Sequence, residues 1–354
     1  MFTGLFFDDS QNCHEEILYI YKKVHIIVLS ELKEVLLMEN LSSIRIFGFV
    51  ANWSPFLLAL IVFFTVVYFL LTKSWYKDIE GGRPLKVSEG VFFVAAMIIL
   101  YAMKGSPVNI LAHISFSFHM VQMACIYLLM APMMYFAIPD YLQKAFVKLP
   151  IAKQVFKIGK KPILALIFFV GVFSLYHIPI VLDFLKTEPT MHTSFEVFLF
   201  VLALLMWYPM FNKVEPQESH IGGLWKILYI FGIGMLLTPA CGLIIFAQSP
   251  MYASYTDGEA WLKAMELCVP VGVLNGLEGS SALSGPQYFL NSTPLADQQT
   301  GGVIMKILQE VFFSVMLIYL FVRWFREEHS NPEETTRRDL ERIQKERELE
   351  KLYR

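Results

Sequence analysis

The sequence predicts an all-α, polytopic membrane protein, a seven-transmembrane helix bundle with its N-terminus outside and its C-terminus inside. Of its 354 residues, 56% are hydrophobic and only 17% are charged, whereas about a quarter of the residues of a soluble domain are charged. The mean hydropathy is +0.52. The apolar residues form continuous runs of about 20, the length that crosses a bilayer as a helix. None of the runs shows the alternation of a membrane β-strand.

Seven such runs are expected to be spans, and the basic residues between them set their direction. Lysine and arginine are concentrated in loops 73–87 and 138–161, whereas loop 248–301 carries only Lys263. Because cytoplasmic loops hold the excess of basic residues, the first two loops are expected inside and the third outside. The expected spans are 53–72, 88–104, 110–137, 161–182, 194–211, 224–247 and 302–324.

The chain divides into three parts. Residues 1–37 resemble a soluble amphipathic extension, and we expect translation to begin at Met38. Residues 38–325 form the membrane domain with outer loop 248–301, and residues 326–354 form a charged cytoplasmic tail. The four cysteines are far apart and predict no disulfide framework. The net charge of −2 says little about partners, and the basic residues are distributed by topology and not gathered into a nucleic-acid patch. The apolar composition predicts the lipid bilayer as a partner, and no nucleic-acid binding is expected.

Three histidines lie in the expected spans, all in the outer half. His113 and His119 belong to the third span and His177 to the fourth. Ionisable groups inside a membrane are costly, which makes them functional candidates. Six residues apart on a helix, His113 and His119 point about 120° from each other. One ion therefore needs a ligand from another helix, and the candidates are His177 and Met305 on the seventh span.

Methionines accompany these histidines. Met123 follows His119 by four residues, and Met120 follows His113 by seven, so each histidine has a thioether on or near its own face. Imidazole and thioether together favour copper, particularly Cu(I), whereas hard cations prefer carboxylates and structural zinc prefers cysteine. The alternative is structural, because membrane histidines often form hydrogen bonds and methionines fill gaps in apolar cores.

Two further features of the sequence have open interpretations. Lys306 and Glu310 lie four residues apart on the seventh span, where they can neutralise each other, and we prefer such pairing to a proton or ion path. Outer loop 248–301 is too long for a simple connection. It is expected to form a lid or a docking surface, with Trp261, Met265 and Cys268 as contacts to a partner or as ordinary packing.

Prolines are expected to kink four spans: Pro132, Pro179, Pro209 and Pro239.

Four motifs together resemble one known family. These are "H-x5-H-M … AP" in the third span, "YHIP" in the fourth, "WYP" in the fifth and "PLADQQTGGVIM" before the seventh. Over about residues 42–324 this order resembles the CtaG family of cytochrome c oxidase (caa-type) assembly factors, and the "DQQ-x-GG-x-IM" part is the most specific. Many relatives have Trp where this chain has Lys306. The residues matched to the family are His113, His119, His177, Asp297, Gln298, Gln299, Gly301, Gly302 and Met305.

The resemblance implies a non-enzymatic protein of the plasma membrane of a Gram-positive bacterium. It implies an assembly factor that acts on cytochrome c oxidase subunits and holds or delivers Cu(I) on the outer side. The sequence contains no zinc-protease, nucleophile-elbow or phosphate-loop motif. The alternatives are a copper or proton transporter and a haem protein in which His113 or His119 pairs with His177.

Overall fold

A computed structural model describes residues 43–214, 222–277 and 284–330, together with residues 337 and 340. All the regular elements among these residues are helical. Six helices are long and apolar enough to cross a membrane, and there are seven crossings if the bent pair α9 (Pro150–Gly159) and α10 (Pro162–Tyr176) counts as one. The expected all-α membrane architecture is confirmed at this level. The proposed extension 1–37 and most of the tail 326–354 lie outside the described residues.

The helices agree with most of the expected spans, and several are longer. The last helix, for example, begins at Pro294 and not near residue 302. The elements are η1 (Ser43–Phe47), α2 (Gly48–Asn52), α3 (Pro55–Phe69), η2 (Leu70–Ser74), η3 (Tyr76–Asp78), α4 (Val87–Lys104), α5 (Pro107–Ile114), α6 (Phe116–Met123), η4 (Ala124–Met130), α7 (Ala131–Ala137), α8 (Asp140–Lys148), α9, α10, α11 (Pro179–Lys186), α12 (Pro189–Phe211), α13 (Gly223–Ile245), η6 (Ala253–Tyr255), α14 (Gly258–Met265), α15 (Val271–Gly276), η8 (Pro286–Tyr288) and α16 (Pro294–Ser330).

The third span, formed by α6, η4 and α7, is the centre of the bundle. In its most apolar window 72% of the residues are buried, against 17% for the spans that contain α3 and α4. Segment η4 is π-helical and is followed by Pro132. Proline has no N–H and clashes with the carbonyl one turn earlier, and a π-helical turn relieves this clash. The outer helices instead expose large apolar side chains such as Phe56 and Leu243, as lipid contact requires.

Two expected spans are broken near one end of the bundle. The third is interrupted at Ser115, whose extended backbone separates α5 from α6 and whose Oγ accepts a hydrogen bond from Phe118 N. The fourth is interrupted at His177 and Ile178, between α10 and α11. Pro179 begins α11, and the residue before a proline avoids the helical conformation, which explains the extended backbone of Ile178. Of the expected kinks, Pro209 and Pro239 lie inside helices.

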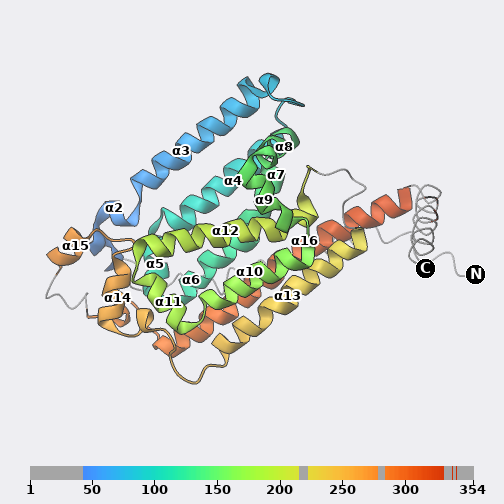
Figure 1. Cartoon of the computed structure of the whole chain (residues 1–354). Helices are drawn as coiled ribbons and strands as arrows, with labels where there is room; N and C mark the ends of the chain where they lie inside the picture. Colours follow the sequence, from blue (N-terminus) through green and yellow to red (C-terminus); the bar gives the residue numbers. More distant parts are fainter. Residues whose placement is uncertain (1–42, 215–221, 278–283, 331–336, 338–339, 341–354) are drawn as a thin grey trace, which may run out of the picture.

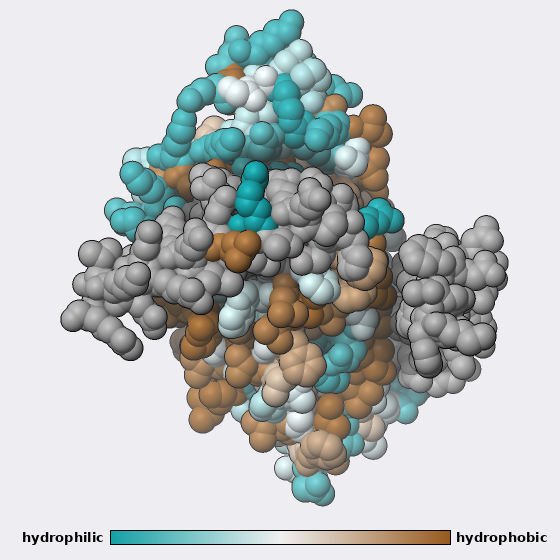
Figure 2. Space-filling model, turned by 90° about the vertical axis from the view of Figure 1, so that its right-hand side faces the viewer, coloured by the Kyte–Doolittle hydropathy of each residue, from teal (hydrophilic) through white to brown (hydrophobic). Residues whose placement is uncertain are grey.

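The two ends of the bundle are built from different loops (Figure 1). Helices α5, α11, α14 and α15 gather at one end, the α14 end, and α8, α9 and the α3–α4 connection lie at the other, the α8 end. The α8 end contains both basic loops. Figure 2 shows hydrophilic residues gathered at the top of that view and a largely hydrophobic surface below them. The connections expected on one side of the membrane therefore lie at one end of the molecule.

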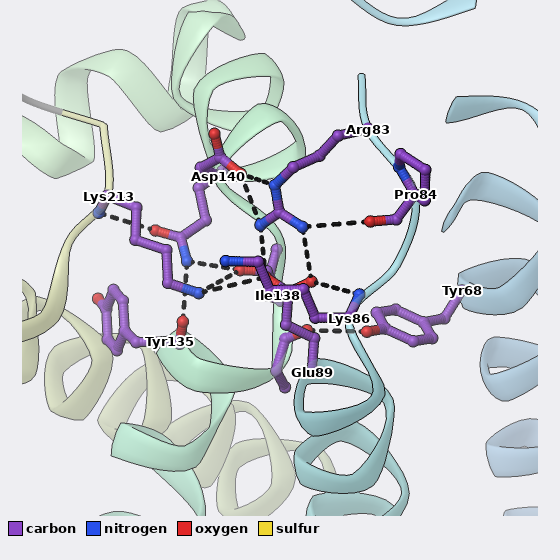
Figure 3. A network of polar contacts seen from close by, with 11 residues as sticks. Tyr68, Arg83, Pro84, Lys86, Glu89, Tyr135, Ile138, Asp140 and Lys213 are labelled. Atoms are coloured by element: carbon purple, nitrogen blue, oxygen red, sulfur yellow. Dashed lines mark hydrogen bonds and ion pairs between the residues drawn. The ribbon is translucent and has the colours of Figure 1, made fainter. Parts of the chain in front are cut away.

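A polar network joins the elements of the α8 end (Figure 3). The Arg83 guanidinium donates to Glu89 Oε1 at 2.6 Å and lies 2.8 Å from Asp140 Oδ1. Lys213 Nζ donates to the carbonyl of Ile138 at 3.1 Å and lies 4.0 Å from Glu89. Hydrogen bonding to Glu89 raises the pKa of Arg83, and burial lowers the pKa of Lys213. The charges are paired within the network, so we interpret it as a structural clamp.

Helix α16 packs against α6 and α13 through two adjacent glycines. A Cβ atom on Gly301 would lie 2.8 Å from Phe116 Cδ1 and 3.1 Å from Ser117 Cα, and one on Gly302 would lie 2.8 Å from Ile245 Cγ1. Only glycine allows the backbones to approach this closely. The two glycines therefore set the distance of the last helix from the centre of the bundle.

We predict that Gly301→Ala destabilises the protein, because the Ser117 backbone cannot move away from the new methyl group. Overpacking of this kind costs about 1–3 kcal/mol. Thermal unfolding of the purified protein in detergent, followed by circular dichroism, measures the effect. Gly171→Ala in α10 is the matched control, since nothing lies within 4 Å of its Cβ position. Equal transition temperatures for the two variants would contradict the packing role.

Candidate functional site

Four histidines are buried together at the α14 end. They come from four segments: α5, α6, the α10–α11 break and α12. Each side chain is between 2% and 6% exposed. They form two ring pairs with closely similar geometry: His119 and His177 have ring centroids 6.0 Å apart at 53°, and His113 and His192 have centroids 6.0 Å apart at 52°. The structure thus brings His119 and His177 side by side and adds His192 to the expected set.

Backbone carbonyls fix the orientation of two of these rings. His113 Nδ1 lies 2.8 Å from the Asn109 carbonyl, and His177 Nδ1 lies 2.7 Å from the Phe173 carbonyl. A carbonyl can only accept, so Nδ1 carries the proton and the Nε2 of a neutral ring keeps its lone pair. Nε2 of His113, His119 and His177 is buried without a hydrogen-bond partner. Buried polar atoms without partners are rare in proteins, and a ring fixed through Nδ1 is the usual arrangement of a metal-binding histidine.

The arrangement favours pairs of nitrogen ligands. Within the described ranges, no group of three or more His, Cys, Asp and Glu side chains comes together in a way that could hold a metal ion. The expected sulfur ligands Met120, Met123 and Met305 are each at most 1% exposed and belong to the main hydrophobic core. They remain candidates for a thioether contact, as a supplement to the histidines.

Aromatic side chains surround the four imidazoles. The Tyr176 ring lies 5.8 Å from His119, 5.2 Å from His177 and 6.4 Å from His192, and its hydroxyl lies 3.2 Å from His192 Nε2. The Phe173 ring lies 4.5 Å from His177. Tyr176 therefore contacts three of the four histidines and separates them from the rest of the core.

The turn η6 from the outer loop covers the cluster. Tyr252 stacks on Phe116 with centroids 4.6 Å apart, and its hydroxyl donates to the His177 carbonyl at 2.9 Å. The Asp183 carboxylate accepts from Ala253 N and Ser254 N, both at 2.9 Å, and from Ser254 Oγ. These bonds hold the outer loop over the break that contains His177. The Nε2 atoms of His113, His119 and His177 are therefore enclosed in this structure.

Lys186 is buried at the edge of the cluster. It is 1% exposed and donates to Tyr255 Oη at 2.5 Å and to the Ala112 carbonyl at 3.4 Å. Helix α11 lies outside the candidate spans, and burial lowers the pKa of Lys186 to about 7. A buried amine can release its proton near neutral pH and thereby reduce the repulsion of an incoming cation.

A buried ion pair that the sequence did not predict joins Lys104 and Glu196. Lys104 Nζ lies 2.5 Å from Glu196 Oε1 and donates to Gln122 Oε1 at 3.1 Å, so it joins α4, α12 and α6. The other oxygen of Glu196 lies 3.8 Å from His192 Nδ1. The expected pair Lys306 and Glu310 also forms, at 2.6 Å, but the Glu310 side chain is 59% exposed.

The "DQQ-x-GG" motif holds helices together at the α14 end. Asp297 accepts from Phe116 N at 2.6 Å, from Ser115 Oγ at 2.7 Å and from Ser117 N at 3.3 Å, so it caps α6 from another helix. Gln298 Oε1 accepts from Met251 N at 2.8 Å, and Gln299 Nε2 donates to the Ala247 carbonyl at 3.0 Å. With Gly301 and Gly302, the motif positions α6 and the outer loop, and through them His119 and its cover.

Outer loop 248–301 has its own hydrophobic core. Trp261 and Met265 are fully buried in it together with residues of η1, α2 and α5. Both are therefore packing residues in this state. Cys268 is half-buried, and burial raises the pKa of its thiol to about 12. It is thus a thiol at neutral pH, whereas copper binds the thiolate.

His192, Lys186 and Glu196 were not recognised from the sequence as parts of the site. His192 precedes the expected span 194–211, and Lys186 lies in the connection between the fourth and fifth expected spans. One signal was present: His192 and Glu196 are four residues apart near the outer end of the fifth span, at the depth already expected for the other histidines. The contacts between segments far apart in sequence, such as Lys104 with Glu196, had no such signal.

We predict that Asp297→Ala destabilises the protein by about 2–3 kcal/mol, because the N–H groups at the start of α6 lose a charged acceptor in a buried place. SDS-induced unfolding in mixed micelles measures the loss. Asp257→Ala is the matched control, because the exposed Asp257 caps α14 through Glu259 N and Ala260 N and its loss should cost about 1 kcal/mol or less. Equal losses would argue against the role of Asp297 as a cap between helices.

Comparison with known proteins identifies the family. The sequence model of the cytochrome c oxidase caa3 assembly factors (Caa3_CtaG) matches residues 66–327, which include all four buried histidines and the "DQQ-x-GG" motif. Comparisons with curated proteins and with solved structures gave no match. The family match covers well over half of the chain, and it agrees with the resemblance of the motifs. The chain therefore belongs to the family of cytochrome c oxidase caa3 assembly factors.

Proposed function

We propose that this assembly factor binds Cu(I) between His119 and His177 and passes it to a cytochrome c oxidase subunit during assembly. The observation that carries the proposal is the pair of buried Nε2 atoms without partners on rings 6.0 Å apart. A metal–nitrogen bond is about 2 Å, so two imidazoles that share one ion have centroids at most about 6 Å apart. The centroid distance of this pair is at that limit, which supports a two-coordinate ion between the two rings.

The choice of Cu(I) rests on coordination number and charge. Zinc requires about four ligands, and hard divalent cations require several oxygens. Cu(I) is soft and monovalent and accepts two neutral nitrogen ligands in line. A monovalent ion between neutral imidazoles also places the least charge in a buried site. Met123, one turn after His119 on the same helix face, is the candidate thioether for a third contact during transfer by ligand exchange.

The haem alternative fits the packing less well. A macrocycle between His119 and His177 would need the space on all sides of the two rings, but Tyr176 and Phe173 pack against them. A transporter would need a continuous polar path through the bundle. The inner halves of the central helix and of α10 are lined by apolar core residues such as Phe169 and Leu128. The geometry therefore supports binding and handover at one side.

The same proposal includes a topology. We infer seven crossings, with the segment from α10 to the start of α11 as the fourth, the α14 end outside and the α8 end in the cytoplasm of a bacterial plasma membrane. Support comes from the basic loops at the α8 end, including Lys148, which pairs with Glu80. Copper then enters and leaves on the outer side.

We predict opposite labelling of cysteines placed at the two ends. Lys153→Cys in α9 should react with a membrane-impermeant maleimide only after the cells are opened, and Lys263→Cys in α14 should react in intact cells. Both positions are exposed, and the background carries alanine at the four native cysteines. The reverse pattern would invert the topology and place the copper site on the cytoplasmic side.

We predict that His119→Ala and His177→Ala each lose the copper held between these two residues and fail to support oxidase maturation, at unchanged protein level. The cause is loss of one of two nitrogen ligands, which leaves a single bond to the ion. Copper per protein is measured after purification under reducing conditions, and oxidase activity is measured in cells that depend on the variant. An absorption spectrum of the same samples tests the haem alternative through its Soret band.

The matched control for these variants is Met191→Leu, an exposed position one residue before His192. It changes a sulfur side chain at the same end without touching the buried cluster, so copper content and oxidase activity should equal those of the wild type. Wild-type copper content in the double variant His119→Ala/His177→Ala would overturn the assignment.

A further inference from the structure

We propose that the cluster contains a second Cu(I) position, between His113 and His192, so that the protein holds two copper ions in two adjacent histidine pairs. This inference rests on the proposed function and deepens it, because it assigns the number of ions and a ligand, His192, outside the motifs that matched the family. The ligand that suits this pair of histidines is a soft monovalent cation.

The first support is the repetition of one geometry. The centroid distance is 6.0 Å in both pairs, and the interplanar angles are 52° and 53°. In each pair one ring is fixed through Nδ1 by the carbonyl four residues earlier, at Asn109 for His113 and at Phe173 for His177. The histidine ring beside His113 is that of His192, and not a ring of the first pair. The buried Nε2 of His113 therefore has no role in a site with one ion.

The second support is the charge beside the second pair. Glu196 is largely buried, with Oε1 paired to Lys104 at 2.5 Å and Oε2 3.8 Å from His192 Nδ1. The carboxylate on the Nδ1 side of His192 favours a proton on that nitrogen and a cation on Nε2, as in the carboxylate–histidine–metal arrangement. The other charged group near this pair is Lys186, which contacts the carbonyl of Ala112, next to His113. This amine, when charged, opposes a cation at the pair.

The third support is the hydrogen bond at His192 Nε2, which a bound ion would replace. In this structure the Tyr176 hydroxyl lies 3.2 Å from that nitrogen and donates to it when Nδ1 carries the proton. Binding of the second ion replaces this hydrogen bond by a copper–nitrogen bond. The Tyr176 ring also contacts both histidines of the first pair. The tyrosine therefore couples the two positions, and its hydrogen bond makes the second position the weaker one.

The test is a competitive Cu(I) titration of the full chain in detergent, under anaerobic reducing conditions, with a chromophoric Cu(I) chelator as the competitor. We expect two equivalents for the wild type and for Met191→Leu, and one equivalent for His192→Gln and for His113→Gln. X-ray absorption should show two nitrogen ligands per copper. Gel filtration and circular dichroism show that each variant is folded, and the two variants approach the same position from opposite sides.

The outcomes separate the two proposals. No copper on the folded wild type would overturn the proposed function. One equivalent, lost in His119→Ala and unchanged in both His192→Gln and His113→Gln, would overturn the second position alone. Two equivalents that both remain in His192→Gln would also overturn it.

A gain of affinity gives an independent measurement. Tyr176→Phe removes the competing hydroxyl, which contributes the free energy of one neutral hydrogen bond, so the weaker of the two dissociation constants should fall by about threefold to tenfold. The tighter constant should change much less. An unchanged weaker constant would overturn the placement of the second ion on His192 Nε2.

Discussion

A helix that breaks inside a membrane must satisfy its freed backbone groups within the protein, because lipid offers no hydrogen bonds. The site of this assembly factor follows from that constraint. The breaks at Ser115 and His177 leave N–H and carbonyl groups that side chains satisfy, from a distant segment at the first break and from one turn away at the second. Asp297 binds the N–H groups at the start of α6, and the His177 ring binds the carbonyl of Phe173. The bonds that repair the helices also orient the imidazoles.

The family motif has a physical explanation in the same terms. Its acidic residue caps the central helix, its amides hold the outer loop, and its glycines let α16 approach α6 and α13 closely. None of these atoms is needed as a metal ligand. The motif builds the support of the site, and the four buried histidines come from other segments: α5, α6, the α10–α11 break and α12. This division explains why the most specific part of the sequence is separate from the proposed chemistry.

Burial gives the cluster its chemical character and also limits its rate of exchange. Neutral nitrogen ligands in a dry, aromatic environment favour a soft monovalent ion over a divalent one. Under the proposed function, the cover formed by η6, held by Asp183 and by Lys186 through Tyr255, has to open for loading and for handover.

The membrane class, the approximate spans, the family and three of the four histidines could be predicted from the sequence, because apolar runs, basic loops and costly polar residues are local signals. Helix geometry also indicated that His113 and His119 diverge and need partners. The tertiary structure supplied those partners: His177 for His119 and His192 for His113. It also decided the buried pair of Lys104 and Glu196. These contacts join residues up to 92 positions apart, and they depend on where the helices break and how closely they pack, which no periodicity records.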